Sequence, residues 1–214
     1  MRIWILIGLS FLEYASSGQT IDRLKINGKY SYNDSVAVVM AFQTAQEAVG
    51  LMYEAMESIW YVTPENWSNR DNLRKQKWEE DEHFVTWLGS ADKMKMARRR
   101  ILRIRKRMSK KVTLHVTKQN RGRCRGWISA WTIPYGKVRI TLCEDFFIYR
   151  THLQDKVIIH EIGHEAGMPF HRHIHGCRTA KRAAISNPNH VAKRSPENYA
   201  WLAMSFLGLK CSDW

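Results

Sequence analysis

Apolar residues recur at alternating steps of four and three along two long stretches of the chain. On an α-helix this spacing gathers apolar side chains on one face, so the pattern predicts two long amphipathic helices. The first should be capped within residues 33–35 and end at 63–64, and the second should be capped within 90–92. The apolar positions, which we expect in the core, are Val38, Phe42, Ala45, Val49, Met52, Met56 and Ile59, followed by Met94, Ala97, Ile101, Ile104 and Met108.

Alternation of apolar and polar residues predicts three strands, over residues 111–117, 127–132 and 137–142. Turn-forming residues at 134–136 separate the last two strands, which should therefore form a hairpin. We expect an α+β fold in one domain over residues 19–214, with long helices packed on a small, mostly antiparallel sheet.

The other segments give weaker signals. Residues 19–32 are short and polar and should form an extended lead-in, while 65–82 should be a surface connection or a broken helix. A helix is expected over 152–166, ended by Gly167. A short helix is expected within 181–184, and a last one over 197–207, because Pro196 suits the first position of a helix.

The N-terminus has the pattern of a secretory signal over residues 1–18. Arg2 is followed by an apolar run within residues 3–12 and by small residues at 15–18. That run is too short to anchor the chain in a bilayer, and we expect no transmembrane segment. The pattern predicts a secreted, extracellular protein, with a buried N-terminal strand as the alternative.

The four cysteines fit an exported chain, where an even number favours two disulfides with three possible connectivities. Cys124 and Cys143 flank the predicted hairpin, so we predict a bridge between them. The second predicted bridge is Cys177–Cys211. The cysteines form no C-x-x-C motif, which argues against a cysteine zinc site.

The chain is strongly basic, with 34 Lys and Arg against 20 Asp and Glu and a net charge of +14. Cations crowd residues 93–111, around the second predicted helix. This run is either a solvated helix face or a strip that binds acidic glycans or anionic surfaces. Secretion and the lack of a nucleic-acid motif argue against specific nucleic-acid binding. We expect a monomer.

A metal-binding motif lies in the predicted helix over 152–166. His160 and His164 are four residues apart, so both imidazoles would lie on one helix face and could bind one zinc ion. Glu161 follows the first histidine, where it could act as general base towards a zinc-bound water. His171, His173 and His175 follow closely, which favours a metal site over a chance match.

Several segments together resemble the deuterolysin-like metallo-endopeptidases, or aspzincins, which include lysine-specific fungal enzymes. The matching segments are residues 87–89, 124 with 127–132, 140–147, 160–164, 187–188 and 195–202. The resemblance implies a zincin-like metalloprotease domain with the H-E-x-x-H helix at the active-site cleft. It also implies a peptide or protein substrate.

The chain departs from this family where the third zinc ligand is expected. The family takes an Asp from a Gly-Thr-x-Asp-x-x-Tyr-Gly segment, but residues 167–177 contain no Asp. His175 stands where the family's Tyr would be and could stabilise the transition state. A histidine must then replace the Asp. The sharp exit at Gly167 favours His171, which we predict, and the family's longer offset favours His173.

The resemblance also suggests residues that contact substrate. Glu197 occupies a position at which lysine-specific members carry an acid in the substrate pocket, although Ala200 replaces the second acid. Glu197 could equally be an acidic residue favoured by the helix dipole. Tyr199 could steady the oxyanion if it faces the cleft. The predicted function is a secreted zinc metalloendopeptidase. The alternative is a catalytically weak zincin-fold protein that binds polyanions or host surfaces.

Overall fold

The structure is a computed structural model that describes residues 23–28, 30–63, 67–117, 123–124, 128–133, 137–149, 151–169 and 175–211. The predicted signal peptide and the loop that carries His171 and His173 lie outside these residues.

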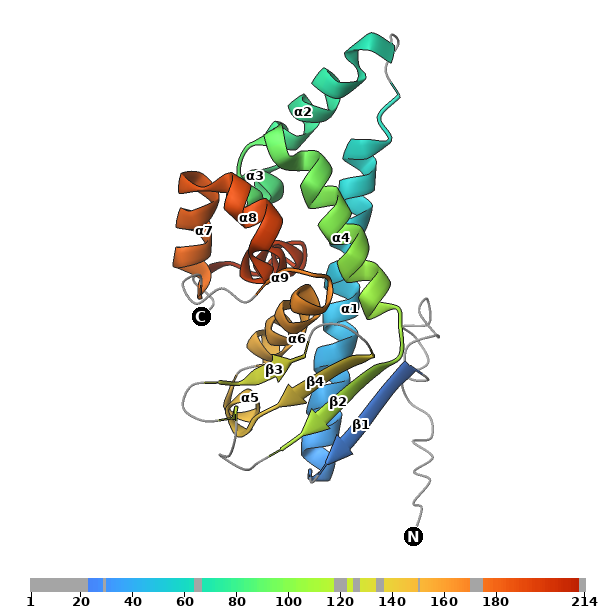
Figure 1. Cartoon of the computed structure of the whole chain (residues 1–214), viewed down its shortest axis with the longest axis vertical. Helices are drawn as coiled ribbons and strands as arrows, with labels where there is room; N and C mark the ends of the chain where they lie inside the picture. The colour runs from blue at the N-terminus through green and yellow to red at the C-terminus, as the bar shows by residue number, and fades with distance from the viewer. Residues whose placement is uncertain are drawn as a thin grey trace.

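The two long predicted helices are present and form the centre of the molecule (Figure 1). Helix α1 covers Tyr32–Trp60 and α4 covers Met94–Met108, and their buried faces include every apolar position predicted from the periodicity. The start of α1 differs from the prediction, because Ser31 is the N-cap and forms a capping box with Asp34. Within the described residues, α1 is the one helix long and apolar enough to cross a membrane, by length and composition only. Here it packs against α4 and against two later helices, α6 (Thr151–Glu165) and α9 (Pro196–Ser205), as a core helix does.

The sheet has four strands in the order β1-β2-β4-β3, at the lower end of Figure 1. The strands are β1 (Leu24–Gly28), β2 (Val112–Val116), β3 (Ala130–Thr132) and β4 (Val138–Leu142). The predicted β3–β4 hairpin is antiparallel, but β1 pairs with β2 and β2 with β4 in parallel. The expectation of a mostly antiparallel sheet was therefore wrong, and residues 24–28 of the predicted lead-in form a strand.

Seven further α-helices cover the rest of the described chain. They are α2 (Arg70–Glu80), α3 (Glu82–Leu88), α5 (Glu144–Ile148), α6 (Thr151–Glu165), α7 (Cys177–Ser186), α8 (Pro188–Arg194) and α9 (Pro196–Ser205). Residues 65–82, expected to be a connection or a broken helix, contain the regular helix α2. Helix α7 is longer than predicted, and α8 was not predicted. The sequence features that could have predicted α8 are Asn187, which is its N-cap, and Pro188 in its first turn.

Helix α6 is central to the site because it contacts both the sheet and the helical part of the molecule. It packs on β3 and β4 on one side and on α1, α4 and α9 on the other. Gly163 makes the contact with α9 close: a Cβ added there would lie 2.7 Å from the Cβ of Pro196. The H-E-x-x-H helix is thus fixed between layers, and its side chains are positioned by rigid elements.

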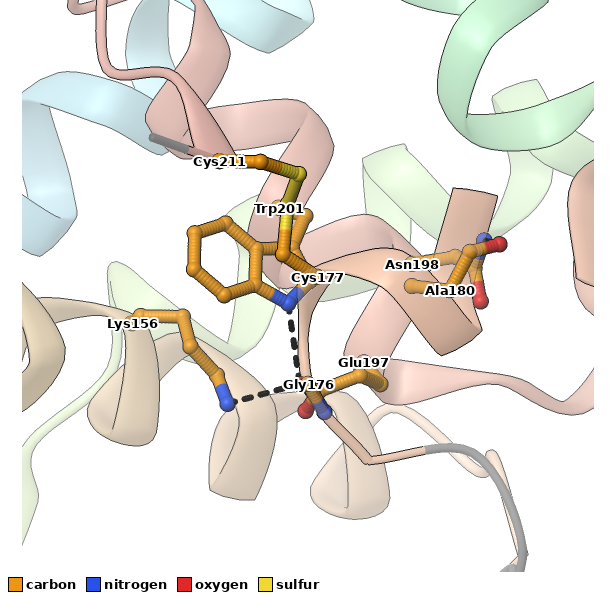
Figure 2. The surroundings of a disulfide bond; sticks show 8 residues. All are labelled: Lys156, Gly176, Cys177, Ala180, Glu197, Asn198, Trp201 and Cys211. Atoms are coloured by element: carbon orange, nitrogen blue, oxygen red, sulfur yellow. Dashed lines mark hydrogen bonds and ion pairs between the residues drawn. A yellow bond between two sulfur atoms is a disulfide. The ribbon is translucent and has the colours of Figure 1, made fainter. Parts of the chain in front are cut away.

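Both predicted disulfides are present. Cys124–Cys143 has a Cα–Cα distance of 5.4 Å and Cys177–Cys211 one of 5.7 Å. The first joins the start of α5 to the chain that precedes β3. The second ties the first residue of α7 to the segment after α9, close to a buried carboxylate (Figure 2).

Candidate metal centre

Helix α6 brings the predicted ligands together. One ligand atom from each of His160, Glu161 and His164 lies within 4.8 Å of the others. The imidazole rings of the two histidines have centroids 4.9 Å apart. This proximity follows from their spacing of four residues on one helix face.

Each of the two imidazoles makes a hydrogen bond through its Nδ1 atom. The His160 Nδ1 lies 2.8 Å from Glu197 Oε2, and the His164 Nδ1 lies 3.0 Å from the backbone oxygen of Met168. A carbonyl oxygen and an ionised carboxylate can only accept, so each Nδ1 carries the hydrogen and donates it. In the neutral form of each ring, Nε2 then carries no hydrogen and can bind a metal ion. Zinc-binding histidines typically have such an acceptor on the other ring nitrogen.

The partner of His164 is supplied by the turn that ends α6. Gly167 has φ of 86°, a left-handed conformation that suits glycine. Its N–H donates to the His164 carbonyl and the Met168 N–H donates to the Gly163 carbonyl, which is the Schellman pattern. The turn brings the Met168 carbonyl back onto the His164 ring. Arg100 of α4 donates to the carbonyls of Ala166 and Gly167, so the helix end is also capped by a cation.

The partner of His160 is the carboxylate of Glu197, which is 1% exposed. Its Oε1 accepts from Lys156 Nζ at 2.8 Å, from the Gly176 N–H at 2.9 Å and from Trp201 Nε1 at 2.9 Å (Figure 2). Burial by itself would raise the pKa of Glu197. The Lys156 ammonium and the His160 hydrogen bond outweigh that effect and hold the pKa below its usual range. Glu197 is therefore ionised and orients His160.

Glu161 is available for proton transfer. It is 6% exposed, and its Oε2 has no hydrogen-bond partner among the described residues. Burial raises the pKa of Glu161 to about 7, although the charges of His160 and Lys156 oppose that rise. A buried carboxylate oxygen without a partner, beside two available imidazole nitrogens, fits a site built for a metal ion and a water molecule.

Two other predicted site residues take different positions. The His175 ring lies beside His160, with ring centroids 6.3 Å apart, so it is close to the site. Tyr199 has no exposed surface, and its hydroxyl donates to the Ala192 carbonyl at 2.7 Å. The condition for a role of Tyr199 at the oxyanion, that it faces the cleft, is therefore not met: its aromatic ring packs in the core, and its hydroxyl hydrogen is bound to Ala192.

The chain is similar in structure to the zinc peptidase from Grifola frondosa, at 17% sequence identity and a TM-score of 0.59. The match covers 81% of this chain and 96% of that one. No family model and no curated protein matches the sequence. The chain shares its fold with that zinc peptidase. The predicted α+β fold is thereby confirmed, with the correction to the sheet given above.

The residue whose role sequence reasoning missed is Glu197. Its first-turn position on α9 suggested a pocket acid or a favourable charge for the helix dipole. The structure instead engages both carboxylate oxygens with four donors, from α6, from α9 and from Gly176 just before α7. The sequence gives no signal for this convergence, because the donors lie up to 41 residues away.

Proposed function

We propose that this chain is a zinc-dependent metalloendopeptidase. The observation that carries the proposal is the arrangement of two imidazoles with fixed Nδ1 partners beside the buried, partnerless Oε2 of Glu161. His160 and His164 would hold one zinc ion. We assign the third ligand to His171, with His173 as the alternative, on sequence grounds.

The zinc ion, when bound, would polarise the scissile carbonyl and make its water more acidic. The chain's own residues would do the rest. Burial raises the pKa of Glu161 towards neutrality, which suits a group that would take a proton from water and return it to the leaving amine. His175 lies beside His160 and would donate a hydrogen bond to the developing oxyanion.

A peptide substrate is supported by the position of β3. It is the edge strand of the described sheet and packs against α6. An extended peptide could pair with such an edge next to the catalytic helix. A preference for lysine receives no support from Glu197, because its carboxylate is already bound by four donors.

We also propose that the protein is secreted, with a signal peptide over residues 1–18 and one domain over 19–214. The two disulfides support this, because such bonds persist in oxidising compartments.

The test is cleavage of a mixed peptide library by the mature protein, with and without a chelator. We expect internal cleavages that the chelator stops and zinc restores. Glu161→Gln should bind zinc and lose at least about a hundredfold in kcat, whereas His164→Ala should lose the metal. Intact peptides after incubation with zinc-loaded wild-type protein would rule out the peptidase.

A further inference from the structure

A basic cavity lies between α4 and α8, on a part of the molecule that the proposed reaction does not use. Its volume is about 190 Å³, and its lining residues are Met96, Arg99, Arg100, Arg103 and Lys193. The lining contains four cations and no acid. Arg99, Arg103 and Lys193 are exposed, so solvent and a ligand can reach them.

Two other cations of α4 have acidic partners. Arg98 pairs with Glu57 at 2.7 Å and Lys95 pairs with Asp71 at 3.3 Å. By contrast, Arg99, Arg103 and Lys193 make no ion pair with any carboxylate in the described part of the chain. These two cations of α4 are therefore paired with acids of α1 and α2, whereas the exposed cations at the cavity have no acidic partner in the described part of the chain.

Arg100 forms the inner side of this cavity and is fixed in place. Its Nη1 donates to the carbonyls that end α6, at 3.1 and 3.0 Å. Burial and the charge of Arg103 lower the pKa of Arg100 from its usual value. Cations packed together without an acid repel one another, and a bound anion would relieve that repulsion.

We propose that this cavity binds the sulfate groups of a sulfated glycan chain. Guanidinium groups bind tetrahedral oxyanions with paired, charge-assisted hydrogen bonds. Arg99 and Arg103 are one turn apart, about 6 Å along the helix, and Lys193 adds a third cation from the neighbouring helix. Such a spread suits a ligand with repeated anionic groups better than one small ion. Two disulfides point to an oxidising compartment, where sulfated glycans are a common polyanion.

Nucleic acid suits the cavity less well. Its lining has no aromatic side chain on which a base could stack, and stacking supplies much of the affinity for single strands. The site does not depend on the peptidase reaction, so binding can be measured with the metal-free protein.

The test is the affinity of a heparin-derived pentasaccharide for the mature chain at about 150 mM salt, where weak surface attraction is screened. The test variant is Arg99→Gln/Arg103→Gln/Lys193→Gln, which leaves Arg100 in place to cap α6. The matched control is Lys110→Gln/Lys111→Gln/Lys137→Gln, which removes the same charge from exposed positions outside the cavity. Thermal melting should show that both triple variants fold.

We expect the test variant to bind at least about tenfold more weakly than the wild type, because each charge-assisted hydrogen bond is strong, and the control to bind within about threefold of it. Equal weakening in both variants would show that only net charge matters and would overturn the proposal. So would the absence of binding by the wild type, or tighter binding to inorganic sulfate, single-stranded RNA or phosphatidylserine vesicles than to the pentasaccharide.

Discussion

The carboxylate of Glu197 and the imidazole of His160 are joined by a hydrogen bond of 2.8 Å between α9 and α6. The same carboxylate neutralises Lys156 and is almost fully buried. Orientation of His160, a proposed metal ligand, therefore depends on a residue 37 positions away in the sequence. The proposed peptidase should lose metal affinity when this contact is removed, even though Glu197 would not touch the metal.

Glu197→Gln should weaken zinc binding by about 10- to 100-fold, as loss of such a partner commonly does. The amide keeps the size of the side chain but removes its charge and leaves one acceptor oxygen instead of two, so His160 and Lys156 can no longer both donate to a carboxylate. Competition with a chromophoric chelator measures the zinc Kd. Glu57→Gln is the control, because it removes a similar ion pair with Arg98 away from the site. Equal zinc affinities for Glu197→Gln and the wild type would exclude the positioning role.

Gly163→Ala should destabilise the fold by about 1–3 kcal/mol, the usual cost of overpacking a core. The added Cβ would meet the Cβ of Pro196 at 2.7 Å and its Cα at 3.2 Å, so backbone must move. Urea unfolding of the metal-free protein measures the change.

Gly50→Ala is the matched control for Gly163→Ala. Gly50 lies inside α1 and no other atom would lie within 4 Å of its Cβ. Alanine should therefore stabilise the protein by about 0.5–1 kcal/mol through its helix preference. If both substitutions shifted stability in the same direction, the close contact between α6 and α9 would not be the cause.

The two disulfides should differ in their effect on the metal site. Removing either pair by Cys→Ser substitution should lower stability by about 2–4 kcal/mol. Cys177→Ser/Cys211→Ser should also weaken zinc binding, because Gly176 beside this bridge donates to Glu197 (Figure 2). Cys124→Ser/Cys143→Ser should leave the zinc Kd unchanged. The measurements are unfolding curves and chelator competition, and identical zinc affinities would refute the link.

Asp155 should make the protein less stable as pH rises. It is 2% exposed, burial raises its pKa to about 7, and its Oδ1 has no partner among the described residues. The folded state therefore binds more protons than the unfolded state between the unfolded pKa near 4 and the folded pKa near 7. Stability from this group is fully present below about pH 4 and is lost as pH rises towards 7.

Asp155→Asn should remove this loss. The unfolding free energy of the variant minus that of the wild type should grow as pH rises. Above pH 7 this difference should reach up to about 4 kcal/mol in favour of the variant. Urea unfolding at several pH values measures the difference. Glu79→Gln on exposed α2 should show no such trend. A pH-independent gap between Asp155→Asn and the wild type would contradict the prediction.

Local patterns in the sequence predicted the parts of the fold that depend on local interactions. The buried apolar faces of α1 and α4 follow from short-range periodicity. The β3–β4 hairpin follows from the alternation of its strands and from turn chemistry. The pairing of β1 with β2 does not, because Leu24 pairs with Val112, which lies far away in the sequence. Strand direction in such a pair is decided by tertiary packing, so the two parallel pairings could not be predicted from alternation.

In the candidate site, too, some features follow from local sequence patterns and others depend on tertiary packing. His160, Glu161 and His164 come together as their spacing predicts. Glu197 and the Met168 carbonyl reach the two imidazoles only through the packing of α9 and the turn at Gly167. The orientation of Tyr199 was left open because helix periodicity alone does not show which neighbour covers a given face. The assignment of the third ligand to His171 or His173 stays a prediction.

The turn at Gly167 couples the end of helix α6 to the orientation of the His164 ring. The Met168 N–H closes α6, and the Met168 carbonyl holds the hydrogen on His164 Nδ1. The last turn of the helix cannot fray without releasing the ring, and the ring cannot rotate without losing its acceptor. Helix fraying and metal release should therefore form one cooperative opening, and hydrogen exchange at the Met168 amide would slow sharply when zinc is bound.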